Sequence, residues 1–217
     1  GTRGPGEQML EYDRRKIKKR IGTLRRELDR LKTHRTLLRK GRKRKGFFIV
    51  SIVGYTNAGK STLLSILTGS PVLVEDKLFA TLDPITRMCR LPNGRNILIT
   101  DTVGFLFDLP PSLISSFHAT LEEINEANII INVIDISSMQ YALQYKTVLE
   151  TLHNIGLDHI PQLVVLNKID VAKDRAPAML LDVTREFPEG ILTSAKTCEG
   201  IDVLLKRLEK AEAFYEH

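Results

Sequence analysis

The feature that most constrains this chain is the segment from residue 54 to residue 61, which follows the apolar residues 47–53. It reads Gly54-Tyr55-Thr56-Asn57-Ala58-Gly59-Lys60-Ser61 and matches G-x-x-x-x-G-K-[ST], a loop whose backbone N–H groups surround phosphates. Lys60 is expected to reach the β- and γ-phosphates and the Ser61 hydroxyl to bind Mg²⁺. A helix starting at Ser61-Thr62 would direct its positive end towards the same anion. The segment predicts a P-loop nucleotide-binding domain.

A second motif, Asp101-Thr102-Val103-Gly104, follows a predicted strand at 96–101. Parallel α/β sheets bind ligands at the carboxyl ends of their strands. We expect the Asp101 carboxylate to hold Mg²⁺, usually through water, and the Gly104 N–H to contact the γ-phosphate. Hydrolysis would then release the loop that follows. An acidic turn at a strand end is the alternative, but the spacing after the phosphate loop favours the functional interpretation.

Two further segments indicate which base is bound. Asn167-Lys168-Ile169-Asp170 follows a predicted strand at 162–166. The Asp170 carboxylate can accept the two neighbouring N–H groups of guanine, which adenine does not offer, so GTP and GDP are the expected ligands. Ser194-Ala195-Lys196, after the last predicted strand, would complete the base pocket. An ATP-preferring variant is the alternative that Asp170 argues against.

The order of the predicted elements defines the fold class. Strands and helices alternate through residues 47–217, which implies a mostly parallel sheet covered on both faces. Pro92-Asn93-Gly94 predicts a hairpin that adds one antiparallel strand. We therefore expect a six-stranded α/β P-loop domain with these elements: strands 47–53, 87–91, 96–101, 129–134, 162–166 and 190–193, and helices 61–68, 112–128, 139–154, one ending within 182–187, and 201–213.

The N-terminal residues 1–46 differ in charge and pattern from the rest. They contain 18 Lys and Arg against 5 Asp and Glu, a balance of +13, whereas residues 47–217 contain 14 against 21, a balance of −7. A long helix is predicted from residue 10 to about residue 39. Its apolar residues follow a heptad seam, which Arg14 and Arg35 interrupt: Leu10, Ile17, Ile21, Leu24, Leu28, Leu31 and Leu38.

This basic arm has two interpretations. The simpler one is a helix that packs its apolar stripe on a neighbour, in this chain or in another. The other adds nucleic-acid binding, because a balance of +13 attracts a polyanion. We expect two domains, 1–46 and 47–217, and a monomer, with a dimer through the seam as the alternative.

The cysteines and the apolar runs indicate in which cellular compartment the protein is expected. Cys89 and Cys198 have no metal-type spacing and do not suggest a disulfide framework, which favours a reducing compartment. No apolar run approaches the ~20 residues that cross a bilayer, and the basic start lacks the apolar segment of a secretory signal. We expect a cytoplasmic protein without membrane contact; a mitochondrial matrix protein is the alternative, if a leader lies upstream.

These segments together resemble the translation-factor-like GTPases, and specifically the HflX family. The residues that carry the closer resemblance are Gly4-Pro5-Gly6-Glu7, Leu10-Glu11, Asp13-Arg14-Arg15, Leu78 to Pro84, Asp101 to Phe105 and Ala119 to Glu123. The resemblance covers essentially the whole chain. Thr2 and Gln8-Met9 depart from the family pattern in the first glycine-rich loop.

The resemblance implies a Mg²⁺-dependent GTPase that binds the large (50S) ribosomal subunit and acts in ribosome splitting, rescue or recycling. It makes Thr81 the switch threonine, binding Mg²⁺ and the γ-phosphate, and adds Phe79 to the nucleotide contacts; spacing alone leaves Thr68 and Thr86 open. It also implies a central fragment, the second helix of a helical hairpin plus the GTP-binding domain, so that the ribosome contacts expected for the family would involve the basic arm and an N-terminal domain that is missing here. The alternative function is a signalling GTPase that recruits a protein partner through the heptad helix.

Phe105 stands where Ras-type enzymes place a glutamine that orients the attacking water. A phenyl ring can neither donate nor accept that hydrogen bond. We therefore expect slow hydrolysis by the chain alone, with Lys60, Thr81 and Gly104 as the groups acting on the phosphate, and stimulation by a large partner that orders residues 75–85 and 105–112.

Overall fold

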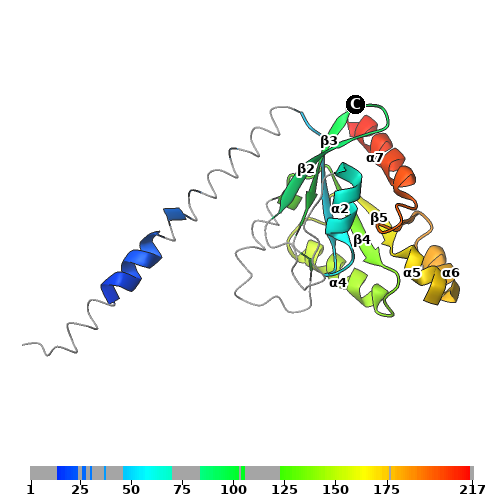
Figure 1. Cartoon of the computed structure of the whole chain (residues 1–217), viewed down its shortest axis with the longest axis horizontal. Helices are drawn as coiled ribbons and strands as arrows, with labels where there is room; N and C mark the ends of the chain where they lie inside the picture. Colours follow the sequence, from blue (N-terminus) through cyan, green and yellow to red (C-terminus); the bar gives the residue numbers. More distant parts are fainter. Residues whose placement is uncertain are drawn as a thin grey trace, which may run out of the picture. The chain divides into compact units, whose positions relative to one another are not determined.

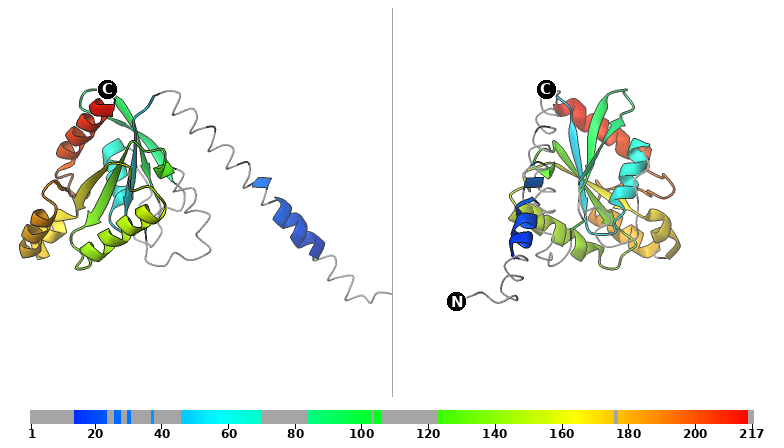
Figure 2. Two further views of the ribbon diagram at one scale, coloured as in Figure 1. Left: turned by 180° about the vertical axis from the view of Figure 1, so that it is seen from behind. Right: turned by 60° about the vertical axis from the view of Figure 1, so that its left-hand side comes forward.

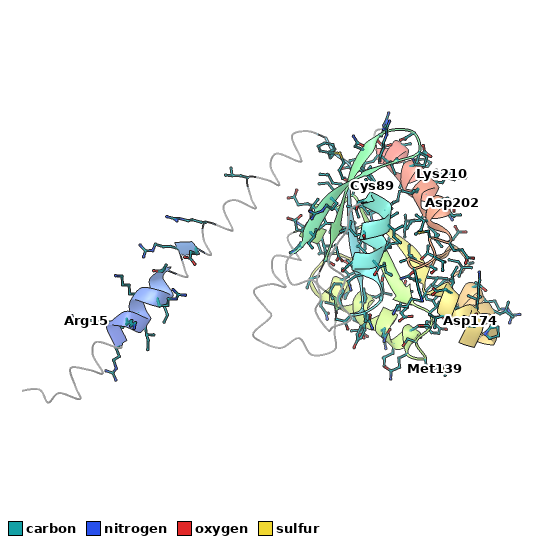
Figure 3. All side chains as sticks on the ribbon, in the orientation of Figure 1. Arg15, Cys89, Met139, Asp174, Asp202 and Lys210 are labelled. Atoms are coloured by element: carbon teal, nitrogen blue, oxygen red, sulfur yellow. The ribbon has the colours of Figure 1, made fainter. Side chains whose placement is uncertain are left out.

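The computed structural model describes residues 14–23, 26–27, 30, 37, 46–69, 84–102, 104–105, 123–175 and 177–215. Contacts divide the chain into two compact units, residues 1–46 and 47–217. In the first unit, residues 14–23 are helical, and Arg15 projects from this helix in Figure 3. Ile17 is 58% and Ile21 45% exposed, so the part of the seam that lies on residues 14–23 faces solvent.

The second unit is built on a sheet that has six strands among the described residues, in the order β2-β3-β1-β4-β5-β6 (Figure 1). Strand β2 is antiparallel to β3, and the other pairs are parallel. This confirms the predicted fold class. The strands are β1 (Ile49–Gly54), β2 (Ile85–Arg90), β3 (Asn96–Asp101), β4 (Ile129–Asp135), β5 (Gln162–Asn167) and β6 (Ile191–Leu192).

Helices cover both faces of this sheet, as Figure 2 shows from two further directions. Helices α2 and α7 pack on one face, and α4, α5 and α6 pack on the other. Their bounds are α2 (Lys60–Thr68), α4 (Tyr141–Asn154), α5 (Ile169–Arg175), α6 (Pro177–Glu186) and α7 (Ile201–Tyr215). Among the described residues, no helix is both long enough and apolar enough to cross a bilayer.

The alternating side chains of the central strands explain the two-sided core. Successive residues of a strand point to opposite faces, so Ile131 of β4 packs towards α2 and α7 while Ile130 packs towards α4. Buried on both faces, β1 and β4 read as nearly continuous apolar runs, each with one polar residue inside the run, Ser51 and Asn132, as parallel strands do. On α7, the charged residues Asp202 and Lys210 lie on the exposed side (Figure 3).

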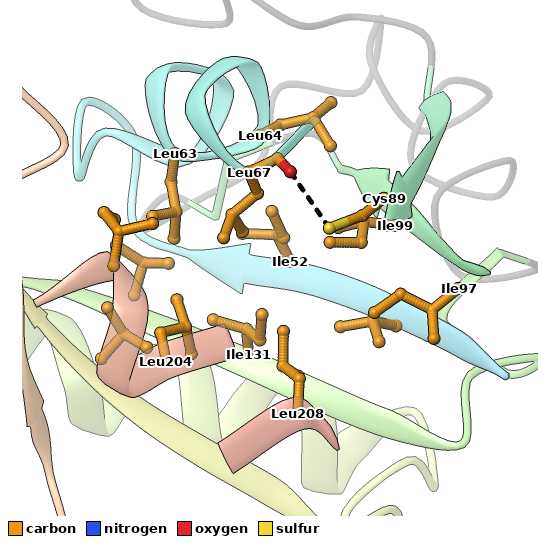
Figure 4. Close-up of a cluster of buried hydrophobic side chains, with 14 of the residues drawn as sticks. Ile52, Leu63, Leu64, Leu67, Cys89, Ile97, Ile99, Ile131, Leu204 and Leu208 are labelled. Carbon is orange, nitrogen blue, oxygen red and sulfur yellow. Dashed lines mark hydrogen bonds between the residues drawn. The ribbon is translucent and has the colours of Figure 1, made fainter. Parts of the chain in front are cut away.

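Cys89 belongs to the core between the hairpin and α2. Its Sγ–H donates to the Leu67 carbonyl oxygen at 3.0 Å, drawn as the dashed line in Figure 4. Burial raises the pKa of this thiol to about 11. Cys89 is therefore a structural residue, whereas Cys198 is exposed.

The structure corrects the predicted elements in three places. Helix α5, Ile169–Arg175, was not predicted, whereas α6 ends at Glu186, within the predicted range 182–187. Strand β2 begins at Ile85, two residues before the predicted start. Of the predicted helix 112–128, only residues 123–128 are described, and helical structure ends at residue 124; the Asn128 side chain instead accepts a hydrogen bond from the Ile49 N–H at 2.7 Å.

Candidate nucleotide-binding site

The predicted phosphate loop lies between β1 and α2, at the carboxyl end of the sheet. Two of its positions require glycine. Gly54 has φ 150°, and a Cβ there would lie 2.4 Å from the Val133 carbonyl oxygen. Gly59 has φ 93°, and a Cβ there would lie 2.4 Å from Asn167 Nδ2. The two glycines let the backbone turn closely against β4 and β5.

Lys60, the first residue of α2, is nearly enclosed, with 6% of its surface exposed. Its Nζ donates to the Tyr55 carbonyl oxygen at 2.9 Å, across the loop. The Lys60 pKa is lowered to about 8, chiefly because burial disfavours the charged ammonium; the Asp101 carboxylate opposes this shift, and the positive charge of Lys168 adds a smaller lowering. A phosphate group in the loop would stabilise the charged ammonium and so raise this pKa.

Ser61 and Asp101 meet where α2 begins and β3 ends. The Ser61 hydroxyl donates to Asp101 Oδ2 at 2.5 Å, and Asp101 is fully buried. A hydroxyl and a carboxylate are hard oxygen donors of the kind that Mg²⁺ prefers. The donor set therefore fits the predicted cation. Thr62, next in α2, is partly exposed.

The residues after Asp101 run back to the phosphate loop. The Phe105 N–H donates to the Gly54 carbonyl oxygen at 3.1 Å, and the Thr56 N–H donates to the Phe105 carbonyl oxygen at 3.0 Å. Gly104 fits so closely that a Cβ would lie 2.7 Å from Thr56 Cγ2 and 2.9 Å from Lys60 Nζ. Gly104 therefore lies beside the ammonium group that is expected to contact the phosphates.

The Phe105 ring is fully buried and packs with Val53, Ile124 and Ile130 beneath α4. The side chain at this position is part of the core. It cannot orient a water molecule in the site.

Asn167, at the end of β5, forms hydrogen bonds with both the phosphate loop and the segment after β6. Its Nδ2 donates to the Ala58 carbonyl oxygen of the phosphate loop at 2.9 Å. Its Oδ1 accepts from the Ala195 N–H at 3.0 Å and from the Thr193 hydroxyl at 3.4 Å. One buried amide thus joins the phosphate loop to the 194–196 segment.

Asp170 lies in the first turn of α5, facing the same segment. Its Oδ1 accepts from the Ser194 hydroxyl at 2.7 Å, and that hydroxyl oxygen accepts from the Thr197 N–H at 3.1 Å. Lys173 of α5 pairs with Glu199 at 2.5 Å. The segment containing Ser194, Ala195 and the exposed Lys196 is therefore anchored on α5.

Lys168 has a partner that the sequence did not reveal. Its Nζ lies 2.8 Å from Asp135 Oδ2, at the end of β4. Asp135 Oδ1 accepts from the Ser137 N–H at 3.0 Å and from the Ser137 hydroxyl at 2.6 Å. The sequence does show that Asp135 ends an apolar strand. It does not show that β4 pairs with β5, and this pairing brings Asp135 to Lys168.

The remaining predicted site residues, Phe79 and Thr81, lie outside the described residues. Both alternatives to Thr81 are held in regular structure. The Thr68 hydroxyl donates to the Leu64 carbonyl oxygen within α2, and the Thr86 hydroxyl is bonded to that of Thr100 across the β2–β3 pair.

Comparisons with known proteins agree with this geometry. Residues 49–168 match the family described as "50S ribosome-binding GTPase", and residues 1–42 match "GTP-binding GTPase Middle Region". A GTPase HflX from Lacrimispora saccharolytica is 50% identical over 96% of this chain and 48% of its own length. The chain thus spans about half the length of such relatives.

Two solved structures resemble the fold. One is a GTP-binding protein from Sulfolobus solfataricus in complex with GDP, with a TM-score of 0.66 and 26% identity, over 95% of this chain and 62% of that one. The other is Era in complex with MgGDPNP and nucleotides 1506–1542 of 16S ribosomal RNA, with a TM-score of 0.61 and 28% identity, over 76% and 56%.

A P-loop at the carboxyl end of a mostly parallel sheet, an adjoining D-x-x-G segment and an N-K-x-D segment define the class of P-loop GTPases. Within that class, the chain belongs to the HflX GTPase family. The predicted resemblance is thereby confirmed.

Proposed function

We propose that this chain binds GTP and GDP with Mg²⁺ and hydrolyses GTP. The observation that carries the proposal is the Asn167 side chain, which joins the phosphate loop to the 194–196 segment beside Asp170. A site that binds the phosphates and the base of one nucleotide needs such a link, because the phosphate loop and the base-binding segment must stay at a fixed distance from each other. Asp170 then selects guanine by accepting its two N–H groups.

Each site residue has a role in this proposal. The backbone of residues 54–62 surrounds the phosphates, and Lys60 contributes its charge to the β- and γ-phosphates. Ser61 and Asp101 hold Mg²⁺ together with Thr81, and Phe79 adds a nucleotide contact. The bound cation neutralises charge that develops on the phosphate oxygens. The Gly104 N–H binds the γ-phosphate, and Lys168, Ser194, Ala195 and Lys196 line the base pocket.

Hydrolysis by the chain alone is slow in this proposal. The burial of Phe105 supports it, because this position offers no polar group to orient the attacking water. Thr81 and Gly104 must be aligned on the γ-phosphate, and a large partner that orders residues 75–85 and 105–112 accelerates the reaction.

We propose the large ribosomal subunit as that partner, with a role in splitting, rescuing or recycling ribosomes in the cytoplasm. Two observations support this. The matched family is described as ribosome-binding, and residues 1–46 have a charge balance of +13, which favours ribosomal RNA.

A second candidate is a signalling GTPase that recruits a protein helix. The exposure of Ile17 and Ile21 favours it, because an apolar stripe in solvent is available for pairing. Salt separates the two candidates. RNA binding weakens steeply as salt rises, whereas apolar helix pairing does not.

The direct experiment measures GTP hydrolysis by the chain with and without large ribosomal subunits. We expect slow turnover alone and at least about a tenfold acceleration with subunits, since partner-supplied stabilisation of phosphoryl transfer is large. Lys60→Ala serves as the inactive control. Fast turnover by the chain alone, or no response to subunits at any salt concentration, would contradict the proposal.

A further inference from the structure

Asp135 is the residue near the site that the motifs leave without a role. It ends β4, and its carboxylate is mostly enclosed, with 15% of the side chain exposed. Both of its oxygens are bonded. Oδ1 accepts from the Ser137 N–H and hydroxyl, and Oδ2 pairs with Lys168. The carboxylate therefore has a fixed position on the sheet.

The backbone of Lys168 is fixed by its position in the chain. It has φ 66°, a left-handed conformation that is uncommon for a residue with a side chain. Its neighbours fix that backbone: Asn167 is bonded to Ala58 and Ala195, and the Ile169 N–H donates to the Thr193 carbonyl oxygen at 3.2 Å. The Lys168 side chain thus starts from the base-binding segment and ends on β4.

The charge of Lys168 also matters to its surroundings. Its position brings it to an anion: Lys168 follows β5, which pairs in parallel with β4, and Asp135 ends β4. The Asp135 carboxylate is the partner of the Lys168 ammonium. The Lys168 ammonium is 2.8 Å from its carboxylate, and its side chain is 27% exposed, so solvent screens this pair less than a surface pair.

We propose that Asp135, held by Ser137, is a positioning residue for nucleotide binding: it pins the Lys168 ammonium so that the alkyl stem forms a wall of the nucleoside pocket. The inference rests on the proposed guanine-nucleotide site and adds a fixed element to it. Asp135 does not touch the ligand. It acts through Lys168 alone.

A double-mutant cycle tests this mechanism. The variants are Asp135→Asn, which removes the charge, Lys168→Met, which keeps a stem without the ammonium, and the pair together, each titrated with GDP and Mg²⁺. Asp135→Asn should weaken GDP binding about tenfold when Lys168 is present and less than about twofold in the Lys168→Met background. Ser137→Ala should weaken it by a smaller factor, about threefold, because the carboxylate stays but loses its support.

A second probe distinguishes positioning from general damage. Pyrophosphate with Mg²⁺ occupies only the phosphate loop, so Asp135→Asn should leave its affinity unchanged within about twofold. Asp158→Asn is the matched control, since Asp158 also has a partner, His153 at 2.7 Å, but lies after α4. It should leave GDP binding as in the wild type.

Additive losses in the cycle, or equal losses for GDP and pyrophosphate, would overturn the inference while the wild type still binds GDP. Absence of GDP binding by the wild type would instead refute the proposed function, and this inference with it. Thermal unfolding of each variant shows whether the fold persists. Should Asp135→Asn unfold, Ser137→Ala in the same cycle with Lys168→Met decides between coupling and additivity.

Discussion

The nucleotide-binding unit and the basic helix use apolar residues in opposite ways. In the unit of residues 47–217, Leu63 and Leu64 of α2 are fully buried against the sheet. In the helix at residues 14–23, Ile17 and Ile21 are about half exposed. Burial of apolar area stabilises a fold from within. An exposed stripe at heptad spacing contributes its free energy only when a partner covers it. The comparison separates a unit that buries its own apolar residues from a helical segment whose apolar residues Ile17 and Ile21 are exposed.

The largest effect expected in the nucleotide-binding unit, residues 47–217, is on recognition of the guanine base. Asp170→Asn replaces an acceptor pair by an amide, so guanine loses one N–H contact while xanthine gains one. GDP affinity should fall by about 10³-fold, because unpaired polar groups in a binding site are costly. Titration with GDP and xanthosine diphosphate measures the change. Unchanged base preference would mean that Asp170 does not contact the base.

The link between phosphate loop and base segment gives the next effect. Asn167→Ala removes the partners of the Ala58 carbonyl and the Ala195 N–H. We expect about a 100-fold loss of GDP affinity and a loss of about 2–3 kcal/mol in unfolding free energy. Calorimetry and denaturant titration measure the two quantities. Asn154→Ala, at an exposed position at the end of α4, is the control. If both substitutions have equal effects, Asn167 does not connect the phosphate loop to the base-binding segment in the way proposed.

A paired substitution tests the comparison itself. Leu63→Ala should lower the unfolding free energy of the nucleotide-binding unit by about 3 kcal/mol, because it leaves a cavity in a packed core. Ile17→Ser should change it by less than about 0.5 kcal/mol. Denaturant titration of both variants is the measurement. If Ile17→Ser destabilises this unit as much as Leu63→Ala does, the helix is part of its core.

The smallest effect concerns the two cysteines. The exposed Cys198 should react with a thiol reagent in the folded protein, whereas Cys89 should react only after unfolding. Burial raises the Cys89 pKa from 9.0 to about 11, so the folded state holds this proton more tightly than the unfolded state does. Stability should therefore fall as pH rises from about 9 to about 11, and Cys89→Ala should flatten that slope. Equal reactivity of both thiols would contradict the burial of Cys89.

Sequence reasoning succeeded where one short stretch carries the whole signal. The phosphate loop, the strand runs at 129–134 and 162–166, and the hairpin at 92–94 are local patterns, and the structure has each of them. It failed where local signals compete. Helix α5 is seven residues long and begins inside the N-K-x-D motif, so no helical period could be read from it.

The contacts of the site were beyond the sequence for a different reason. Asn167 and Ala58 are 109 positions apart, and Ala195 is 28 positions further on. Asp135 meets Lys168 only because β4 and β5 pair in parallel. Residue types and spacing yield a prediction of which groups form the site. The register of the sheet determines which of them touch.

Guanine recognition is the central claim, and calorimetric titration of the wild-type chain with GDP and with ADP, both with Mg²⁺, tests it most directly. We expect one GDP bound per chain and an affinity for ADP at least about 10³-fold weaker. No heat with GDP, or equal binding of the two nucleotides, would contradict it.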